Sequence, residues 1–574
     1  MEHIKRYEAW LNNHSFDEET RKELVNIKDD KDEIEDRFYR DLEFGTAGLR
    51  GKIGAGTNRM NMYIIARTTQ GIAEYIKEQG VDYINRGVAI AYDIRHFSRE
   101  FAKKTALVLA ANGIKAYLFE DIRPTPELSY AVRRLNTAAG VVITASHNPK
   151  DYNGYKVYWE DGSQILDHVV EGMMEKIEAI TDFTGIMAME EEEALRLGLL
   201  VVVGKELDDE YTEKVKELAL TEEIDKDIKI VYTPLNGTGN ILVRRVLRER
   251  GFTNVVVVPE QEHPDPDFKT VGYPNPEDLK AFTYAIGKAK EVGAELIFAT
   301  DPDCDRVAAM ARDTSGEYIA LSGNQTGAIL IKYMLETMKK QNTLSNNGYI
   351  VKSIVTGDMG KAIAQTYGVN TIETLTGFKH ICGKVNELEE KNIYQFILGY
   401  EESIGYVAGT FVRDKDGVIA SMLLCEACAY YKTQGKSLLE VLEELYQKHG
   451  YYQEKLISLV LDGIEGQKRI SRMMEDYRQQ YPLLIEGVKL SSYTDYEKQI
   501  YFDLTNDQQK AVDLPVSNVL RFMLEDGSWY AVRPSGTEPK IKIYMYSKGK
   551  TLDEALNKIK VMEEVIMNKL NQVV

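Results

Sequence analysis

Residues 87–146 read GVAIAYDIRHFSREFAKKTALVLAANGIKAYLFEDIRPTPELSYAVRRLNTAAGVVITAS. Short apolar runs in this stretch, such as GVAIAYD and AAGVVITAS, alternate with segments such as REFAKKTALVLAANG, whose apolar residues recur at helical spacing. That alternation is typical of βαβ units, in which a parallel sheet carries helices on both faces. The stretch therefore predicts an α/β domain.

The same alternation recurs further along the chain, between residues 227 and 260 (DIKIVYTPL to TNVVVVPE) and between residues 348 and 377 (GYIVKSIVT to NTIETLTG). After about residue 450 the pattern changes to strand-like runs such as SWYAV and IKIYMY beside long helical segments, which indicates an antiparallel sheet in an α+β domain. The predicted fold class is therefore α/β, with three consecutive α/β domains with mixed, mainly parallel sheets, plus a C-terminal α+β domain.

The length agrees with that number of domains. At roughly 150 residues for each domain, a chain of this size predicts about four. We expect domain I at residues 1–205, domain II at 206–315, domain III at 316–448 and domain IV at 449–574.

Composition and charge narrow the class of protein. Hydrophobic residues make up 44% of the 574 and charged residues 28%, which is typical of a soluble protein with a large core. The formal charge of −19 repels phosphate backbones, so we expect no nucleic-acid partner. There is no signal-peptide pattern and no run of about 18 apolar residues, so we expect no membrane association and a cytoplasmic location. Four cysteines in so long a chain fit a reducing compartment.

A candidate nucleophile follows the run AAGVVI, in the segment TASHNP at residues 144–149. Ligands bind beyond the carboxyl ends of strands in open α/β sheets, and Ser146 stands at such an end. Its flanks are not G-x-S-x-G, which disfavours a nucleophile elbow of the hydrolase type. A simple polar turn is the open alternative. Lys156 comes ten residues later, past a Gly-containing turn, and is a candidate general acid or base, although a lone lysine is more often a surface charge.

An acidic loop follows a second buried strand pattern, AELIFAT, and reads Asp301-Pro302-Asp303-Cys304-Asp305-Arg306. Three carboxylates at alternate positions repel one another unless a hard cation lies among them. An EF-hand needs Gly at its sixth position and Glu at its twelfth, where this chain has Arg306 and Arg312. A loop with few carboxylates leaves room for water and a phosphate oxygen, which favours Mg²⁺. The alternative is a solvated acidic turn.

Three more segments carry polar groups that suit an anion or the hydroxyls of a sugar. RPSGT at residues 533–537 combines a guanidinium, two hydroxyls and a glycine, and predicts an anion site or a hairpin turn. GTAGLRG at residues 45–51 places Arg50 in a Gly-rich loop, and GYEESIGY at residues 399–406 places two carboxylates and Ser403 after a strand. Each of the last two is equally compatible with a loop of solvated charges.

Taken in this order, these segments resemble the α-D-phosphohexomutase family, most closely its phosphoglucomutase and phosphopentomutase branches, over roughly residues 40–550. The resemblance implies four domains around a central cleft, to which each domain contributes one loop. These loops correspond here to TASHNP, DPDCDR, GYEES and RPSGT. The metal loop departs from the glycine-richer DGDGDR that is common in the family, without loss of a carboxylate.

The resemblance also implies roles at the reacting end of the site. Ser146 corresponds to the serine that carries the phosphoryl group, and its phosphoryl oxygen joins Asp301, Asp303 and Asp305 around Mg²⁺. Arg50 and Arg306 correspond to the arginines that stabilise the transferring phosphoryl group. Lys156 and Lys415 correspond to lysines considered for proton transfer, and His147 corresponds to a histidine beside the phosphoserine.

Roles at the substrate end follow in the same way. Glu401 and Ser403 correspond to the pair that reads O3 and O4 of the sugar. The segment TLTGFKH at residues 374–380 resembles the sugar-specificity loop, with Phe378 in place of the family's Trp. Its substrate-binding candidates are Thr376, Gly377 and Lys379. The candidates for holding the phosphate that does not react are Arg533, Ser535, Gly536 and Thr537.

The resemblance implies a phosphoglucomutase that interconverts glucose 1-phosphate and glucose 6-phosphate, with glucose 1,6-bisphosphate as intermediate and activator. Glu402 makes the sugar loop E-E-S, which looks like the glucose-preferring form. The alternatives are phosphopentomutase, phosphomannomutase, synthesis of the sugar bisphosphate and a non-catalytic sugar-phosphate binder. We expect small-molecule sugar phosphates as partners, and a monomer or homodimer.

Overall fold

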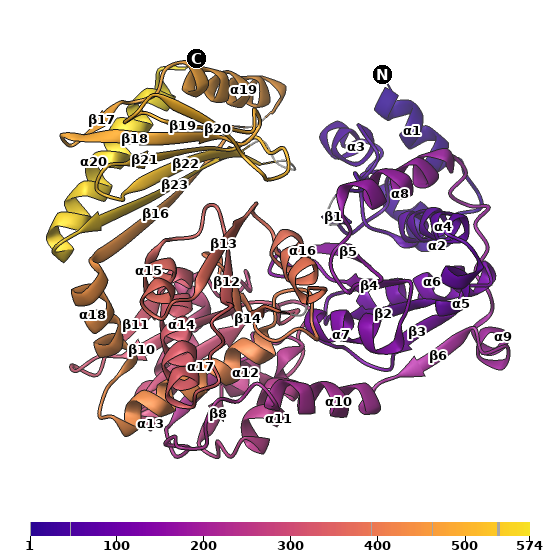
Figure 1. Cartoon of the computed structure of the whole chain (residues 1–574). Helices are drawn as coiled ribbons and strands as arrows, with labels where there is room; N and C mark the ends of the chain where they lie inside the picture. The colour runs from indigo at the N-terminus through magenta and orange to yellow at the C-terminus, as the bar shows by residue number, and fades with distance from the viewer. Residues whose placement is uncertain (1, 46–47, 392, 462, 536–539, 574) are drawn as a thin grey trace.

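The structure is a computed structural model that describes residues 2–45, 48–391, 393–461, 463–535 and 540–573. Figure 1 shows the N-terminal domain and the C-terminal domain as separate lobes that face each other above the two middle domains.

Domain I begins with a cap of three short helices, α1 (Glu2–Leu11), α2 (Glu18–Asn26) and α3 (Lys31–Phe38). Asp17 and Asp30 precede α2 and α3, and each side chain accepts a backbone N–H bond from the first turn. The cap has a core of its own, which includes Trp10, Phe16 and Phe38.

The sheet of domain I has the order β1-β5-β4-β2-β3-β6. Its strands are β1 (Leu49–Lys52), β2 (Val88–Tyr92), β3 (Ala116–Phe119), β4 (Ala139–Ile143), β5 (Tyr152–Trp159) and β6 (Leu200–Val203). β2, β3, β4 and β6 run parallel, whereas β5 is antiparallel to β4 and to β1. The helices of this domain are α4 (Met62–Glu78), α5 (Val81–Arg86), α6 (Ser98–Ala111), α7 (Thr125–Leu135), α8 (Asp167–Ala179) and α9 (Glu191–Arg196).

Domain II has a sheet of order β11-β10-β9-β7-β8. Its elements are β7 (Ile230–Thr233), β8 (Val255–Val257), β9 (Leu296–Thr300), β10 (Val307–Arg312), β11 (Tyr318–Leu321), α10 (Lys205–Lys216), α11 (Gly239–Glu249), α12 (Pro259–Glu262), η1 (Leu279–Phe282) and α13 (Thr283–Val292). β9 and β10 pair antiparallel, because the short acidic loop between them cannot span a parallel crossover. The acidic loop is therefore the turn of a hairpin.

Domain III has a four-stranded sheet of order β13-β12-β14-β15, in which the β14–β15 pair is antiparallel and the other two pairs are parallel. Its elements are α14 (Gly323–Lys340), β12 (Gly348–Ser353), α15 (Met359–Thr366), β13 (Asn370–Thr374), α16 (Phe378–Glu389), β14 (Gln395–Glu401), β15 (Gly405–Val407), α17 (Gly417–Thr433) and α18 (Leu438–His449). Cys425 and Cys428 lie buried on α17, as part of its packing.

Domain IV is built on an antiparallel sheet of order β16-β23-β22-β21-β18-β19-β20, with β17 paired to β18. Its elements are β16 (Tyr451–Val460), α19 (Gly463–Gln479), β17 (Leu484–Ile485), β18 (Val488–Asp495), β19 (Ile500–Asp503), β20 (Gln508–Ala511), β21 (Leu520–Leu524), β22 (Trp529–Pro534), β23 (Lys540–Gly549) and α20 (Leu552–Asn571). Helices α19 and α20 share a hydrophobic core with the sheet.

The predicted fold class is confirmed: three α/β domains with mixed sheets precede an antiparallel α+β domain. One continuous core joins part of domain I to domains II and III, whereas domain IV meets domain III through a smaller cluster that includes Val355 and Trp529. The exact boundaries between the four domains, as given from the sequence, remain predictions. Over the part of the chain that the structure describes, no helix combines the length and apolar character that crossing a membrane requires.

Candidate active site

Ser146 lies three residues beyond β4, at the carboxyl end of the strand. Its φ of 51° is in the left-handed region, and its backbone N–H donates to Thr144 Oγ1 at 2.8 Å. The hydroxyl donates to Asp301 Oδ2 at 2.8 Å and lies 3.2 Å from His147 Nδ1. Ser146 is buried, and its side chain contacts the acidic loop of the next domain.

Ser146 lies in the loop between β4 and β5, residues 144–151, which we call the serine loop. Two residues that we did not single out from the sequence, Asp93 and Arg95, hold this loop in place. Arg95 donates to the backbone oxygens of Ser146 (2.6 Å), Pro149 (2.7 Å) and Tyr152 (3.1 Å). The Asp93 carboxylate lies 3.3 Å from Arg95 and accepts from Thr144 Oγ1 at 2.7 Å. Both side chains are fully buried. Their position directly after β2, at the same sheet edge as Ser146, is the signal that the sequence contained.

The acidic loop brings its three carboxylates together. Asp301, Asp303 and Asp305 are buried, and one ligand atom from each lies within 4.8 Å of the others. Asp301 Oδ1 accepts the backbone N–H groups of Asp305 (3.1 Å) and Arg306 (3.0 Å), which curls the loop. Cys304 has a φ of 53°, as the tight turn requires.

Glycines of two other segments allow close packing against this loop. A Cβ on Gly237 would lie 2.6 Å from Pro302 Cα, and one on Gly417 would lie 2.6 Å from the Cys304 carbonyl oxygen. Residues 233–239, TPLNGTG, therefore form a tight turn that packs against the acidic loop. Thr238 in this turn donates its N–H to Pro302 O at 2.8 Å.

The carboxylates fit a divalent cation. Asp303 Oδ1 and Asp305 Oδ1 are buried and accept no hydrogen bond from any described residue, so each retains an oxygen for another ligand. Burial and the charges of Asp305 and Asp303 raise the pKa of Asp301 well above its ordinary value. Burial also opposes ionisation of Asp303, but Lys156 outweighs it and lowers the pKa of this carboxyl. A cation among these oxygens would relieve the remaining repulsion.

Both predicted lysines reach the acidic loop. Lys156, on β5, donates to Asp303 Oδ2 at 2.7 Å and to Asp305 Oδ2 at 3.5 Å. Lys415 Nζ lies 3.2 Å from Asp305 Oδ2 and 3.2 Å from Asp414 Oδ1. Burial lowers the pKa of both lysines, but the neighbouring carboxylates outweigh burial and raise it. The two lysines therefore carry positive charge beside the acidic loop.

Arg50, His147 and Arg306 surround the same point. Arg50 Nη1 donates to Asn148 Oδ1 at 3.3 Å, and Arg306 Nη1 donates to Ser403 O at 3.4 Å. Arg306 Nε is buried and meets no hydrogen-bond acceptor within the described part of the chain. Burial, followed by the charges of Arg306 and Arg50, lowers the pKa of His147 well below its ordinary value. A neutral imidazole therefore lies beside the serine hydroxyl.

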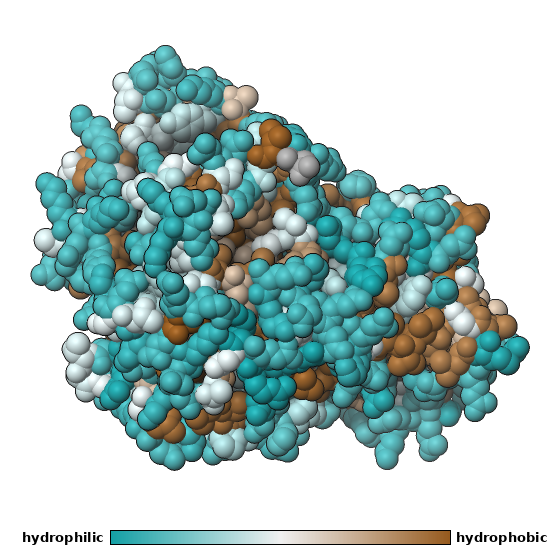
Figure 2. Space-filling model, turned by 60° about the horizontal axis from the view of Figure 1, so that its bottom comes forward, coloured by the Kyte–Doolittle hydropathy of each residue, from teal (hydrophilic) through white to brown (hydrophobic). Residues whose placement is uncertain are grey.

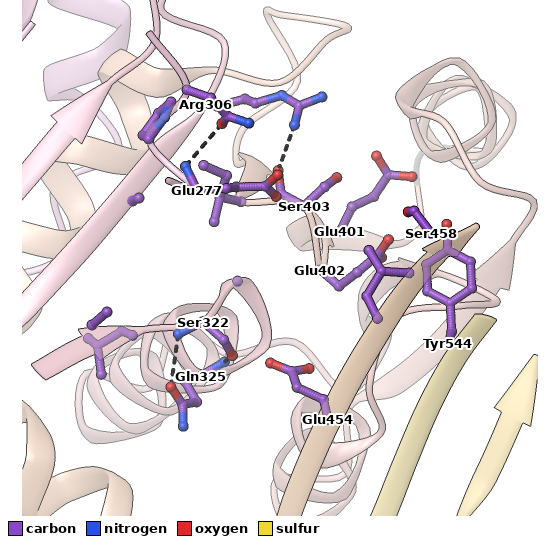
Figure 3. Close-up of a pocket in the computed structure, with 18 of the residues that line it drawn as sticks. Glu277, Arg306, Ser322, Gln325, Glu401, Glu402, Ser403, Glu454, Ser458 and Tyr544 are labelled. Atoms are coloured by element: carbon purple, nitrogen blue, oxygen red, sulfur yellow. Dashed lines mark hydrogen bonds between the residues drawn. The ribbon is translucent and has the colours of Figure 1, made fainter. Parts of the chain in front are cut away.

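A pocket of about 770 Å³ opens in front of these groups, in a mostly hydrophilic molecule whose surface is hollowed near its centre (Figure 2). Figure 3 shows Arg306 and Ser403 on one wall, Glu401 and Glu402 beside them, and Tyr544 on the opposite wall. Of the predicted site residues, those that line the pocket are His147, Arg306, Thr376, Glu401, Ser403 and Arg533. The pocket therefore extends from the reacting groups to a strand of domain IV.

Four domain models of one family match the chain in series. They are described as phosphoglucomutase/phosphomannomutase alpha/beta/alpha domain I (residues 41–183), domain II (209–316) and domain III (322–449), and as the C-terminal domain (495–563). The chain belongs to the α-D-phosphohexomutase family. The resemblance that the sequence motifs indicated is thus confirmed.

Curated relatives span nearly all of this phosphohexomutase chain. A phosphoglucomutase of Staphylococcus haemolyticus (strain JCSC1435) is 40% identical over 524 residues, which cover 89% of this chain and 91% of the relative. One of Staphylococcus aureus (strain MRSA252) is 37% identical over 541 residues, which cover 94% and 96%.

Solved structures share the fold. A putative phosphomannomutase from Thermus thermophilus superposes with a TM-score of 0.66 at 23% identity, covering 92% of this chain and 99% of its own. The open form of parafusin, a phosphoglucomutase from Paramecium, superposes with a TM-score of 0.68 at 19% identity, covering 93% and 96%.

Not every predicted residue of this phosphohexomutase lines the pocket. Lys379 instead forms an ion pair of 2.8 Å with Asp167 of domain I. Gly377, whose φ of 115° suits a glycine, donates its N–H to Glu401 Oε1 at 2.6 Å and so orients that carboxylate. Ser535 follows β22 beside Arg533, whereas Gly536 and Thr537 lie outside the described residues.

The pocket of the phosphohexomutase also contains groups that sequence reasoning missed. Lys540 and Lys542 of β23 line it beside Arg533, and Arg533 and Lys542 are direct cross-strand partners. Burial, followed by the charges of Lys540 and Arg533, lowers the pKa of Lys542. Glu277 of domain II faces Arg306 in the same pocket (Figure 3). The sequence contained a signal for the two lysines: in the run Lys-Ile-Lys that follows RPSGT, alternate residues of a strand lie on the same face.

Proposed function

We propose that this chain is a phosphoglucomutase, which interconverts glucose 1-phosphate and glucose 6-phosphate through a phosphorylated Ser146 and glucose 1,6-bisphosphate. One observation carries the proposal: the Ser146 hydroxyl contacts Asp301 of a buried three-carboxylate cluster, beside a pocket lined by sugar-reading and cationic side chains. The curated relatives named phosphoglucomutase, at 37–40% identity over most of the chain, support the same activity.

Asp301, Asp303 and Asp305 would hold the metal, together with an oxygen of the phosphoryl group on Ser146. We propose Mg²⁺, because an all-oxygen set with only three protein carboxylates leaves positions for water and phosphate. When bound, the metal would supply positive charge that neutralises the phosphoryl oxygens.

In the first transfer, the Ser146 Oγ–P bond breaks while the free hydroxyl oxygen of a sugar monophosphate bonds to phosphorus. One proton passes from that hydroxyl to Ser146 Oγ, and we propose Lys156 and Lys415 as the groups that relay it. Arg50 and Arg306 are the cations that would steady the transferring group, whose charge must be neutralised by fixed donors.

The sugar is held at the other end of the pocket. Glu401 and Ser403 would bind its O3 and O4, and Arg533 would bind the phosphate that does not react. Ser535, Gly536 and Thr537 complete the proposed phosphate site. The bisphosphate then turns end for end, so that its second phosphate returns to Ser146 and the isomeric monophosphate is released.

The decisive experiment is mutase turnover of Ser146→Ala with glucose 1,6-bisphosphate supplied. We expect turnover to fall by at least about 10⁴-fold, because the phosphoryl acceptor is lost. Near-normal turnover would disprove the phosphoserine route. A parallel comparison of glucose, mannose and ribose 1-phosphates tests the sugar, since the matched family also includes phosphomannomutases.

Cytoplasmic location and a monomeric or homodimeric state remain part of the proposal. The buried, free state of all four cysteines supports a reducing compartment.

A further inference from the structure

The helical cap of domain I, α1 to α3, ends before residue 41, where the first family model begins to match. The cap packs on α4, where Phe16 and Tyr63 lie with ring centroids 4.5 Å apart. Its polar contacts are concentrated on residues 53–59, the turn that directly follows β1. The cap therefore supports the segment next to Arg50.

A half-buried ion pair of the cap contacts this turn at one residue. Glu23 of α2 accepts the backbone N–H of Ala55 at 3.1 Å, and Arg37 of α3 donates to the carbonyl oxygen of the same residue at 3.1 Å. Arg37 also pairs with Glu23 itself and donates to Glu33 at 2.7 Å. We call the contact of Glu23 and Arg37 with Ala55 the Ala55 clamp.

The glycines on either side of Ala55 show how closely the cap approaches. A Cβ on Gly54 would lie 2.9 Å from Glu23 Oε1, and one on Gly56 would lie 2.9 Å from the Arg37 carbonyl oxygen. Their φ angles of 150° and 137° also favour glycine. The turn is thus shaped to fit the clamp.

The turn connects the clamp to the serine loop. Ile53 donates its N–H to the carbonyl oxygen of Asp151 at 2.7 Å. The preceding strand β1 has only four residues and stands at the edge of the described sheet, with Arg50 opposite Gly154 of β5. From this edge strand, Arg50 reaches Asn148 of the serine loop. An edge strand this short gains little rigidity from its own ladder.

We propose that Glu23 and Arg37 are positioning residues: by holding Ala55, they fix β1 and so aim the Arg50 guanidinium at the phosphoryl group on Ser146. This inference rests on the proposed role of Arg50 in phosphoryl transfer. A cation that stabilises a transition state must be placed to within a fraction of an ångström, so loss of the clamp lowers turnover more than substrate binding.

The test replaces Arg37 by Met in the full chain and measures kcat and KM for glucose 1-phosphate. We expect kcat to fall about tenfold and KM to stay within about twofold. Arg86→Met is the matched control, because Arg86 forms a similar half-buried ion pair with Glu160 at 2.6 Å and donates to two backbone carbonyls of domain I away from the pocket. We expect Arg86→Met to have a melting temperature similar to that of Arg37→Met, but to keep a near-normal kcat.

A double variant identifies the route of the effect. In an Arg50→Met background, Arg37→Met should cause no further loss of kcat, since the clamp acts through Arg50. Arg37→Lys should recover part of the activity. Glu23→Gln, a milder change, should lower kcat about threefold and tests the clamp if Arg37→Met does not fold.

The outcomes separate the two proposals. Normal kcat in Arg37→Met and Glu23→Gln, with an impaired Arg50→Met, would overturn the clamp alone. Additive losses in the double variant would show that Arg37 does not act through Arg50. Full activity of Arg50→Met would overturn both the role of Arg50 and the inference built on it.

Discussion

The two ends of the proposed active site are built differently. At the reacting end, defined by Ser146, Asp301, Asp303 and Asp305, the groups are buried and held by bonds from more than one domain. At the holding end, defined by Arg533, Lys540 and Lys542, the cations are partly exposed on two neighbouring strands of domain IV. The reacting end is thus assembled before substrate binds, whereas the holding end belongs to a separate lobe.

The attachment of that lobe has its own chemistry. Trp529 Nε1 donates to Asp358 of domain III at 2.8 Å, and Arg521 donates to Glu373 at 2.8 Å. These polar contacts surround a small apolar cluster between the domains. The charge that develops during phosphoryl transfer is stabilised by donors held in fixed positions, whereas binding of the phosphate that does not react requires only a cationic site. We therefore expect changes at the reacting end to lower kcat and changes at the holding end to raise KM.

The largest effect is expected from Asp303→Asn at the reacting end. The substitution removes a charge from the proposed metal site and leaves Lys156 without its nearest carboxylate, so kcat should fall about 10³-fold. Steady-state kinetics across a Mg²⁺ titration, and activity after chelation and metal return, measure it. Activity that survives complete chelation would show that the acidic loop is not a metal site.

A smaller loss of kcat is expected when the residue that supports the serine loop, Arg95, is replaced. Arg95→Met removes the four backbone contacts that hold the serine loop, to the carbonyl oxygens of residues 146, 148, 149 and 152, and kcat should fall about 10²-fold with KM nearly unchanged. The rate of ³²P transfer from labelled enzyme reports the same step directly. Equal losses in the Arg86→Met control would indicate a general effect on domain I instead.

The holding end should respond in the opposite way. Arg533→Met removes the proposed charge-assisted contact to the distal phosphate, worth about 2 kcal/mol, so KM should rise about 30-fold while kcat changes by less than about threefold. Initial rates at saturating and limiting sugar phosphate separate the two constants. A loss confined to kcat would remove the distinction between the two ends.

The smallest effect concerns Glu402, which lies between the two ends and accepts a hydrogen bond from Thr356 Oγ1 at 2.9 Å. Burial and the charge of Glu401 raise the pKa of Glu402 from 4.5 to about 7. The unfolded chain loses this proton first, so the carboxyl lowers folded stability as pH rises from about 4.5 to about 7.

Glu402→Gln removes this pH-dependent cost. Its melting temperature should exceed that of the parent by about 3 °C at pH 8 and match it at pH 4.5. Thermal unfolding at the two pH values, followed by circular dichroism, measures the difference. The same shift at both pH values would mean that the gain in stability does not come from the ionisation of Glu402.

Much of the site was predictable because its signals are local. A serine at the end of a buried strand and three aspartates at alternate positions can be recognised within ten residues, and both were found in the structure where the sequence placed them. Arg95 was missed because its partners are backbone oxygens some fifty residues away, and Asp93 was missed because it acts by pairing with Arg95 and by accepting a hydrogen bond from the distant Thr144 hydroxyl. Lys379 illustrates the reverse, since only the fold reveals its pairing with Asp167.

The sequence by itself determined the alternation of strands and helices, the change to an antiparallel domain and the choice of Ser146 and the three aspartates as candidate site residues, because these depend on periodicity and on neighbouring residues. The tertiary structure alone decided which groups meet. Ser146 and Asp301 are 155 residues apart and belong to different sheets, and their hydrogen bond forms only because domains I and II pack through a shared core. The same packing places Lys156 on Asp303, a contact that no local pattern encodes. The separate core of the helical cap brings Glu23 and Arg37 to Ala55, which is equally hidden in the local sequence.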